Sequence, residues 1–412
     1  MTQSTTTQGS QTLIELTDYR ELEEALKRGR ELVLEGTKAE SDEFVHGTLI
    51  AVDGREHLNR RRALMRMINP SQPWGAEGKL IDEVFADNLQ RVLETVEPVD
   101  GVRRFDLVDF LRRIIWRFTA KFVGIDGIDD DEQTGRFVKL AVPVVSGLSI
   151  EYLPEDKRAE VLEIARNARK AIREELFDPS LERRRALIAA GAGEDELPAD
   201  LLTSLLQADT PSSDDMIFKE AIQLLAASVN NPVLQLTLSL DDVTTWLDEH
   251  PEDCARISDR EFVNAAVKET LRLHRASRPY LVRRAVKEIT LETTGRVIPE
   301  GAWVAGYLME ADHDESVFGA NPEAYDPYRV LNDPKVPHFG LAFGAGPHVC
   351  IGRPMLLWEQ GNPESQGVQT KVLRFLLENG VRRDADGVQS LESERGSHRF
   401  THYDVIVPEK TA

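Results

Sequence analysis

Apolar residues recur every three or four positions through most of residues 18–275, and this period limits the chain to a fold built largely of α-helices. The spacing predicts helices over 18–29, 56–68, 79–96, 104–124, 155–177 and 214–247. We expect breaks between helices at clusters of Gly, Pro and Asp such as "GIDGIDDDEQ", "DPS" and "AGAGEDELPAD".

The period changes near residue 279. Residues 280–308 alternate and are rich in Val, Ile and Thr, which predicts short β-strands. Residues 312–352 have little periodicity, and so long an irregular stretch inside a compact region is usually functional. A helix over 367–380 and a strand over 402–409 are expected to follow. The pattern as a whole predicts a mainly α fold with small β-sheets.

Composition excludes some functions. The 412 residues include 41% apolar side chains and carry a net charge of −21, which opposes binding to nucleic acid or to an anionic membrane. No apolar run reaches the roughly 18 residues that a membrane-spanning helix needs. The N-terminal segment 1–16 starts with a polar, uncharged stretch and lacks a secretory signal, so we expect a disordered tail on a cytoplasmic protein.

Two cysteines, Cys254 and Cys350, lie far apart in a chain without an export signal, so no disulfide is expected. Cys350 lies in the glycine-rich stretch "FGAGPHVCIG". Glycines allow a backbone to approach a flat ligand and to point amides at a sulfur, as a metal-bound thiolate requires. A buried cysteine in a tight turn, or a nucleophile paired with His348, stays open as an alternative.

The stretch "FGAGPHVCIG" resembles the haem-binding signature of the cytochromes P-450, in which Phe343, Gly344 and Gly352 surround the cysteine. The resemblance implies that Cys350 is the axial thiolate of haem b (iron protoporphyrin IX) and that His348 approaches a haem propionate. It also implies the single-domain α+β fold of that family over residues 17–412, with haem between a distal helix and the cysteine loop.

Other segments resemble the same family in the same order. "KETLRL" carries Glu269 and Arg272, which the resemblance joins to Arg329 of "YDPYR" as a structural triad behind the cysteine loop. Without the resemblance, Glu269 and Arg272 read as a surface ion pair on one helix face. "DGREHLNRRRAL" and "YLVRRAVKEI" are similar to the segments that bind the haem propionates. The residues implied there are His57, Arg61 and Arg283.

Two segments depart from the family's pattern. The resemblance begins with a helix that lies much further from the N-terminus in typical members, so we expect the leading strands and first helix to be absent. The segment "GNPESQG" interrupts the helix that normally follows the cysteine.

The predicted helix over 214–247 resembles the distal helix of the family, which normally carries an acid followed by a threonine where oxygen binds. Asn230 and Asn231 take these two positions, and Pro232 follows them. An amide does not titrate near neutral pH, so the asparagines can only hold a water or a substrate hydroxyl that passes a proton. Pro232 removes a helical hydrogen bond, which predicts a kink or an opened turn.

The resemblance implies a monooxygenase that hydroxylates or O-dealkylates a hydrophobic small molecule with O₂ and electrons from a ferredoxin and its reductase. The asparagine pair keeps a peroxide-driven enzyme, a peroxygenase or hydroperoxide isomerase, as an alternative. A non-catalytic protein that binds haem or a hydrophobic ligand is the third possibility. The sequence does not identify the substrate.

Overall fold

The structure is a computed structural model that describes residues 5–8, 11–34, 39–68, 79–193, 196–208, 212–275, 280–359 and 367–409. The chain divides into two compact units, each built from separate segments. The first unit comprises residues 1–34, 85–111 and 231–412, and the second comprises 35–84 and 112–230. Helices α5 (Lys79–Thr95), α6 (Leu107–Val123) and α11 (Asp214–Glu249) contribute to both. The expected single domain over 17–412 stays a prediction.

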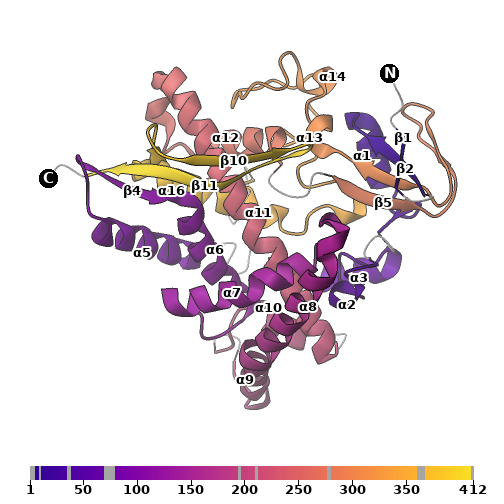
Figure 1. The fold of residues 1–412 in the computed structure, drawn as a ribbon, viewed down its shortest axis with the longest axis horizontal. Helices are drawn as coiled ribbons and strands as arrows, with labels where there is room; N and C mark the ends of the chain where they lie inside the picture. The colour runs from indigo at the N-terminus through magenta and orange to yellow at the C-terminus, as the bar shows by residue number, and fades with distance from the viewer. Residues whose placement is uncertain are drawn as a thin grey trace. The chain divides into compact units, whose positions relative to one another are not determined.

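The first unit contains the sheets of the described chain (Figure 1). Its elements are β1 (Thr5–Gln8), β2 (Gln11–Leu16), α1 (Tyr19–Lys27), β3 (Leu32–Val33), β4 (Val102–Asp106), η3 (Pro251–Arg256), α12 (Arg260–Leu273), β5 (Leu281–Ala285), β6 (Ile289–Thr290), β7 (Val297–Ile298), β8 (Trp303–Gly306), α13 (Leu308–Ala311), α14 (Glu315–Phe318), η4 (Gly346–His348), α15 (Arg353–Leu356), α16 (Val368–Glu378), β9 (Arg382–Arg383), β10 (Gln389–Glu394) and β11 (Ser397–Pro408).

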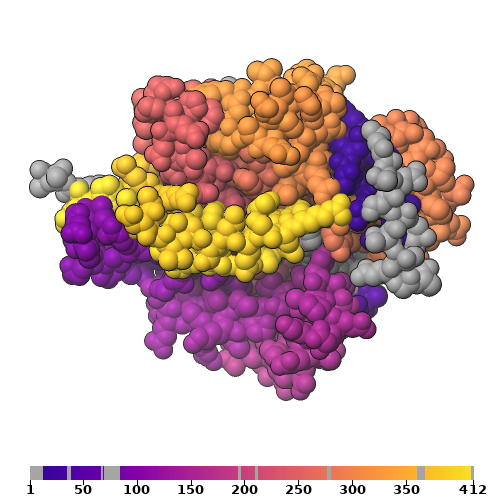
Figure 2. Space-filling model, turned by 45° about the horizontal axis from the view of Figure 1, so that its top comes forward, coloured from indigo at the N-terminus to yellow at the C-terminus, as the bar shows by residue number. Residues whose placement is uncertain are grey.

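The largest sheet has five strands in the order β1-β2-β8-β5-β3, in which β2 and β8 are parallel and the other pairs are antiparallel. A second sheet joins β10, β11 and β4, with β9 also paired to β11. β10 is exposed over most of its length and lies with β11 in the yellow region at the surface in Figure 2. Strands β6 and β7 form a separate pair.

The N-terminal segment corrects the prediction of a disordered tail. Residues 11–16 form β2, whose register on β8 runs from Leu13 opposite Trp303 to Leu16 opposite Gly306. Ile14 and Leu16 are buried. Backbone pairing with a strand far along the chain orders a segment whose own composition gives no such signal. The expectation that no strand precedes the first predicted helix is also wrong.

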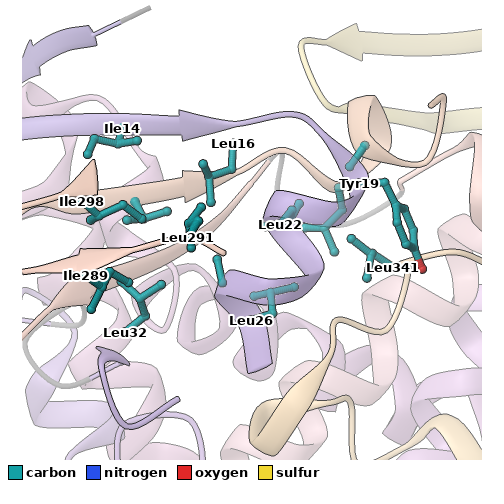
Figure 3. Packing of buried hydrophobic residues seen from close by; sticks show 14 of the residues in the cluster. Ile14, Leu16, Tyr19, Leu22, Leu26, Leu32, Ile289, Leu291, Ile298 and Leu341 are labelled. Atoms are coloured by element: carbon teal, nitrogen blue, oxygen red, sulfur yellow. The ribbon is translucent and has the colours of Figure 1, made fainter. Parts of the chain in front are cut away.

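Helix α1 forms the core of the first unit together with the large sheet. Asp18 caps it by accepting the N–H of Glu21 at 2.9 Å, and its apolar side chains recur every three or four residues. Tyr19, Leu22 and Leu26 are therefore buried against strand residues on one side and Leu341 on the other (Figure 3). A Cβ placed on Gly306 of β8 would lie 2.3 Å from Leu22 Cδ1, so α1 packs very close to this strand.

The second unit is helical in its described part. Its elements are α2 (Asp42–Val45), α3 (Gly54–Ile68), α7 (Asp131–Gly147), η1 (Ile150–Tyr152), α8 (Glu155–Ile172), η2 (Arg173–Phe177), α9 (Asp178–Ala189) and α10 (Leu201–Leu206).

Two sequence predictions in the helical region need correction. The break predicted at "DPS" is absent, because a π-helical turn, η2, joins α8 directly to α9. Pro179 directly follows this π turn, where the regular ladder of helical hydrogen bonds is already altered, so the helix continues past it. The helix predicted from residue 104 begins instead at Leu107, because residues up to Asp106 pair with β11 as strand β4. Among the described helices, none is both long and apolar enough to cross a membrane.

Candidate functional site

The loop around Cys350 is a tight turn held by its own backbone. The N–H of Cys350 donates to the carbonyl of Phe343 at 2.8 Å, and the N–H of Gly344 donates to the carbonyl of Leu341 at 2.7 Å. Gly344 and Gly346 adopt φ values of 70° and 69°, which side-chain-bearing residues rarely adopt. Cys350 is exposed and, like Cys254, forms no disulfide within the described chain. The loop therefore holds an exposed cysteine on a fixed backbone.

Residues predicted to surround the cysteine lie in or beside this loop. Phe343 is buried and packs edge-on against Phe339, and His348 is half-buried in η4. If Gly352 carried a Cβ, it would lie 3.9 Å from Cys350 Sγ, so the backbone passes close to the sulfur. A Cβ on Gly344 would lie 3.8 Å from Leu281 Cδ1, which places the start of β5 against the loop. Arg283 follows on β5, is buried, and donates to the carbonyl of Val282.

The three residues of the expected triad are buried and meet. Glu269 Oε1 accepts the Nε–H of Arg329 at 2.8 Å, and both carboxylate oxygens accept donors from Arg272, at 2.7 and 2.9 Å. Glu269 is 3% exposed and Arg272 is fully buried. Further donors of the two arginines reach backbone carbonyls that include those of Phe318 and Asp312. The surface ion pair that the bare sequence suggests is thus a buried, hydrogen-bonded cluster.

Asp312, which the sequence analysis missed, links the triad to the cysteine loop. Its carbonyl accepts Arg272 Nη1 at 2.8 Å, and its side chain Oδ1 accepts the N–H of Leu341 at 2.8 Å. A Cβ on Gly340 would lie 2.1 Å from the same Oδ1, so only glycine fits beside this carboxyl. Burial raises the pKa of Asp312 well above its usual range, against the opposing effects of the Leu341 N–H and of Arg272. Local sequence carries no signal for this contact.

Helix α1 also supports the loop. A Cβ on Gly346 would meet the carbonyl oxygen of Leu26 at 2.4 Å, so the loop packs directly on the end of the helix. Tyr19 on α1 is buried, and its hydroxyl has no hydrogen-bond partner in the described chain. This side chain, Glu23 and Arg353 line a cavity of about 250 Å³ beside the loop. In the sequence, Gly346 was the residue that could have indicated this close packing between the loop and α1.

The expected propionate residues His57 and Arg61 lie one turn apart on α3. His57 is 1% exposed and Arg61 is half-buried. Residues four apart share a helix face, so the two side chains are neighbours. Since α3 belongs to the second unit, their approach to the cysteine loop stays a prediction.

Helix α11 carries the expected distal residues and runs unbroken through Pro232. The alternative of an opened turn is therefore wrong, and the kink stays a prediction. Asn230 and Asn231 are exposed, whereas Pro232 and Val233 are buried. Ala227, one turn before the asparagines, is exposed as well. A single face of an otherwise buried helix thus presents two amides. The interruption predicted after α15, at 361–367, lies almost entirely outside the described residues, since only Gly367 is described.

The cysteine loop has the features that a thiolate ligand of haem iron needs. Cys350 is exposed, the backbone of Gly352 passes close to its sulfur, and the loop contains glycines with positive φ. His348 lies in η4 within the loop, and Arg283 lies two residues after Leu281, whose side chain approaches Gly344. These residues fit a haem with two carboxylates.

Comparison with known proteins gives the same family throughout. A family model described as cytochrome P450 matches residues 241–359. A cytochrome P450 of family 716, subfamily AD, from Melia azedarach is 26% identical over 194 residues, 38% of this chain and 39% of the relative. The chain thus spans about two fifths of the length of that relative. Cytochrome P450 CYP107DY1 of Priestia megaterium is 25% identical over 319 residues, 76% of this chain and 66% of the relative.

Among solved structures, CYP109E1 from Bacillus megaterium in complex with testosterone covers 97% of this chain and 94% of its own, with a TM-score of 0.71 and 17% identity. At this identity the likeness concerns the fold, which is the mainly α fold with small sheets predicted from the sequence.

Proposed function

Because this chain belongs to the cytochrome P450 family, whose cofactor is haem, we propose that it is a monooxygenase that inserts one atom of O₂ into a hydrophobic small molecule. The observation that carries the proposal is the Cys350 loop, which is tied through Asp312 to the buried Glu269 cluster. Haem bound there would supply the oxygen-activating iron. In the overall reaction, one oxygen atom enters the substrate and the other leaves as water, at the expense of two electrons and two protons.

Each residue of the site has a distinct role in this proposal. Cys350 would be the axial thiolate, and the fixed loop backbone would hold its sulfur in one position. His57, Arg61, Arg283 and His348 would bind the two propionates, since carboxylates favour nearby cations and N–H donors. Asn230 and Asn231 would hold a water or a substrate hydroxyl, because an amide both donates and accepts. The Glu269 cluster would keep the loop rigid.

The electrons would come from a ferredoxin-type partner and its reductase. The substrate would be hydroxylated or O-dealkylated. Neither the partner nor the substrate has a signature in the described residues. A spectral titration of the haem-loaded ferric protein against a small-molecule library would identify the substrate's chemical class, because a ligand near the iron displaces bound water and shifts the haem spectrum.

The test of the haem site compares Cys350→Ala with Cys254→Ala, which changes another exposed cysteine, on η3. The reduced protein under carbon monoxide should show the red-shifted band typical of thiolate ligation. Cys350→Ala should abolish the band, and Cys254→Ala should leave it unchanged. Absence of the band in the unmodified protein would end the proposal.

A peroxide-driven enzyme is the second candidate, favoured by the asparagines at the positions of the acid and hydroxyl. An enzyme that receives peroxide needs no separate delivery of protons to reduced oxygen. Turnover with hydrogen peroxide, but not with O₂, ferredoxin and reductase, would select this candidate. The reverse result would exclude it.

A further inference from the structure

Helix α11 carries a buried acid on the turns that precede the asparagines. Glu220 is 2% exposed, and its Oε1 accepts the N–H of Leu49 at 3.1 Å and Arg60 Nη1 at 3.2 Å. Its other oxygen, Oε2, is buried and has no hydrogen-bond partner within the described residues. Leaving a buried carboxylate oxygen unpaired is unfavourable. The proposed function gives Glu220 no role.

A second buried acceptor lies one turn further along the same helix face. Gln223 is 5% exposed, and its Oε1 also lacks a partner in the described part of the chain. Residues three apart are neighbours on a helix. Each of these two acceptors therefore lacks a donor in the described chain, which a proton or a water molecule would supply. Either the carboxyl of Glu220 is protonated and donates, or a water donates to both.

The surroundings of Glu220 let it exchange that proton near neutral pH. Burial raises the pKa of Glu220 to about 7, while Arg60 and the Leu49 N–H act in the opposite direction. Arg60, the one charged group on α3 that contacts this carboxyl among the described residues, is shared with Glu56 at 3.1 Å. A group that titrates at working pH is best suited to give and recover a proton.

The face that carries these groups continues to the asparagines. Residues 220, 223, 227 and 230 follow the three-and-four spacing of one helix face, and a rise of about 1.5 Å per residue places 220 and 230 about 15 Å apart along the axis. Ala227 between them is small and exposed, and Asn230 is exposed. Water between Gln223 and Asn230 would be bound by amides at both ends.

We propose that Glu220 supplies protons, through waters bound by Gln223 and along α11, to the group held at Asn230, in place of the acid that this position lacks. The inference rests on the proposed function. In each step the O–H bond of Glu220 breaks and a water takes the proton while passing one of its own to the next acceptor. The carboxylate left behind is paired with Arg60 and regains a proton from solvent. No electrons move in this step.

The first test does not depend on activity. Glu220→Gln keeps the size and an acceptor for Arg60 and Leu49 but removes the titrating proton. Infrared difference spectra of the haem-loaded protein, recorded between about pH 6 and about pH 8, should show a carboxylic-acid band that disappears as pH rises. The band should be missing in Glu220→Gln and kept in Gln223→Leu. A band of equal size in Glu220→Gln would overturn the proposal.

The second test separates proton delivery from a structural role. In Glu220→Gln and in Gln223→Leu, the yield of product per O₂ consumed should fall by about tenfold or more, because protons arrive too slowly. Turnover with hydrogen peroxide should stay unchanged, since peroxide brings its own protons. The substrate used is the tightest ligand found by spectral titration.

Arg60→Gln is the structural control, because it breaks the ion pair and leaves the acid. If Glu220→Gln and Arg60→Gln lose haem and both kinds of turnover equally, while Gln223→Leu behaves normally, Glu220 serves only to position α3 and the proposal fails. Failure of the proposed function looks different, because the unmodified protein would then lack the thiolate-type spectrum or any O₂-driven product. The infrared band would be unaffected by that failure.

Discussion

The cysteine loop and the middle of α11 differ in how their buried polar groups are satisfied. Behind the loop, Glu269 receives donors from two arginines, and Asp312 joins one of them, Arg272, to the Leu341 N–H. On α11, the side chains of Glu220, Gln223, Gln235 and Ser239 each keep a buried atom without a partner in the described chain. A fully bonded network fixes one geometry, whereas unpaired groups require water or a proton. Under the proposed function, the loop would hold Cys350 rigidly, and the middle of α11 would present a face that water can adapt.

The largest effect should come from breaking the network behind the loop. Arg272→Leu leaves Glu269 as a buried carboxylate with half its partners, which should lower the free energy of unfolding by about 3–5 kcal/mol. Denaturant unfolding of the haem-loaded protein measures this. Arg399→Leu, which removes the exposed ion pair to Glu392, is the control and should change stability by less than about 1 kcal/mol. Equal effects of the two variants would mean that the buried network is not what holds the loop.

A smaller effect should follow from separating the loop from α1. Gly346→Ala forces a Cβ to 2.4 Å from the Leu26 carbonyl at a φ of 69°, and should lower the free energy of unfolding by about 2–4 kcal/mol in strain and overpacking together. Gly295→Ala is a matched control, because its φ is 73° and nothing lies within 4 Å. Gly295→Ala should lower the free energy of unfolding by only about 1–2 kcal/mol. The difference between the two measures the helix contact alone.

The third prediction concerns pH. Since burial raises the pKa of Asp312 in the folded state, the folded protein keeps a proton that the unfolded chain releases, and stability falls as pH rises above about 4. Asp312→Asn still accepts the Leu341 N–H and never ionises. Its stability relative to the unmodified protein should therefore improve from acid to neutral pH, which thermal unfolding across that range would measure. Asp333→Asn is the opposite control, because the Lys335 N–H and Arg20 lower the pKa of Asp333. If the stabilities of Asp312→Asn and the unmodified protein changed in parallel with pH, the raised pKa of Asp312 would be contradicted.

The smallest effect on stability should come from the distal face. Asn230→Asp combined with Asn231→Thr alters two exposed side chains, so the free energy of unfolding should change by no more than about 0.5 kcal/mol. The yield of product per O₂ consumed should nevertheless change, because an acid and a hydroxyl replace two amides. An unchanged yield would return both asparagines to a purely structural role and remove the functional side of the comparison.

The sequence predicted the long helices well because a sustained apolar period defines a helix locally. The helix expected over 214–247 is α11, Asp214–Glu249. The predictions failed where a distant segment decided the structure: β2 is ordered by β8, and residues 104–106 become part of β4 by pairing with β11. The "DPS" break failed for a different reason, since a π turn before Pro179 lets the helix continue past the proline.

The same division holds for the site. The sequence by itself determined the cysteine signature, the Glu269 and Arg272 pair, and the amides at 230 and 231, because these features lie within short stretches whose chemistry is local. Only the tertiary structure showed that Asp312 holds Leu341, that Leu26 excludes a side chain at 346, and that Arg60 binds Glu220. Each of these contacts joins residues far apart along the chain, and burial, which sets their hydrogen bonding and pKa, exists only once those segments pack.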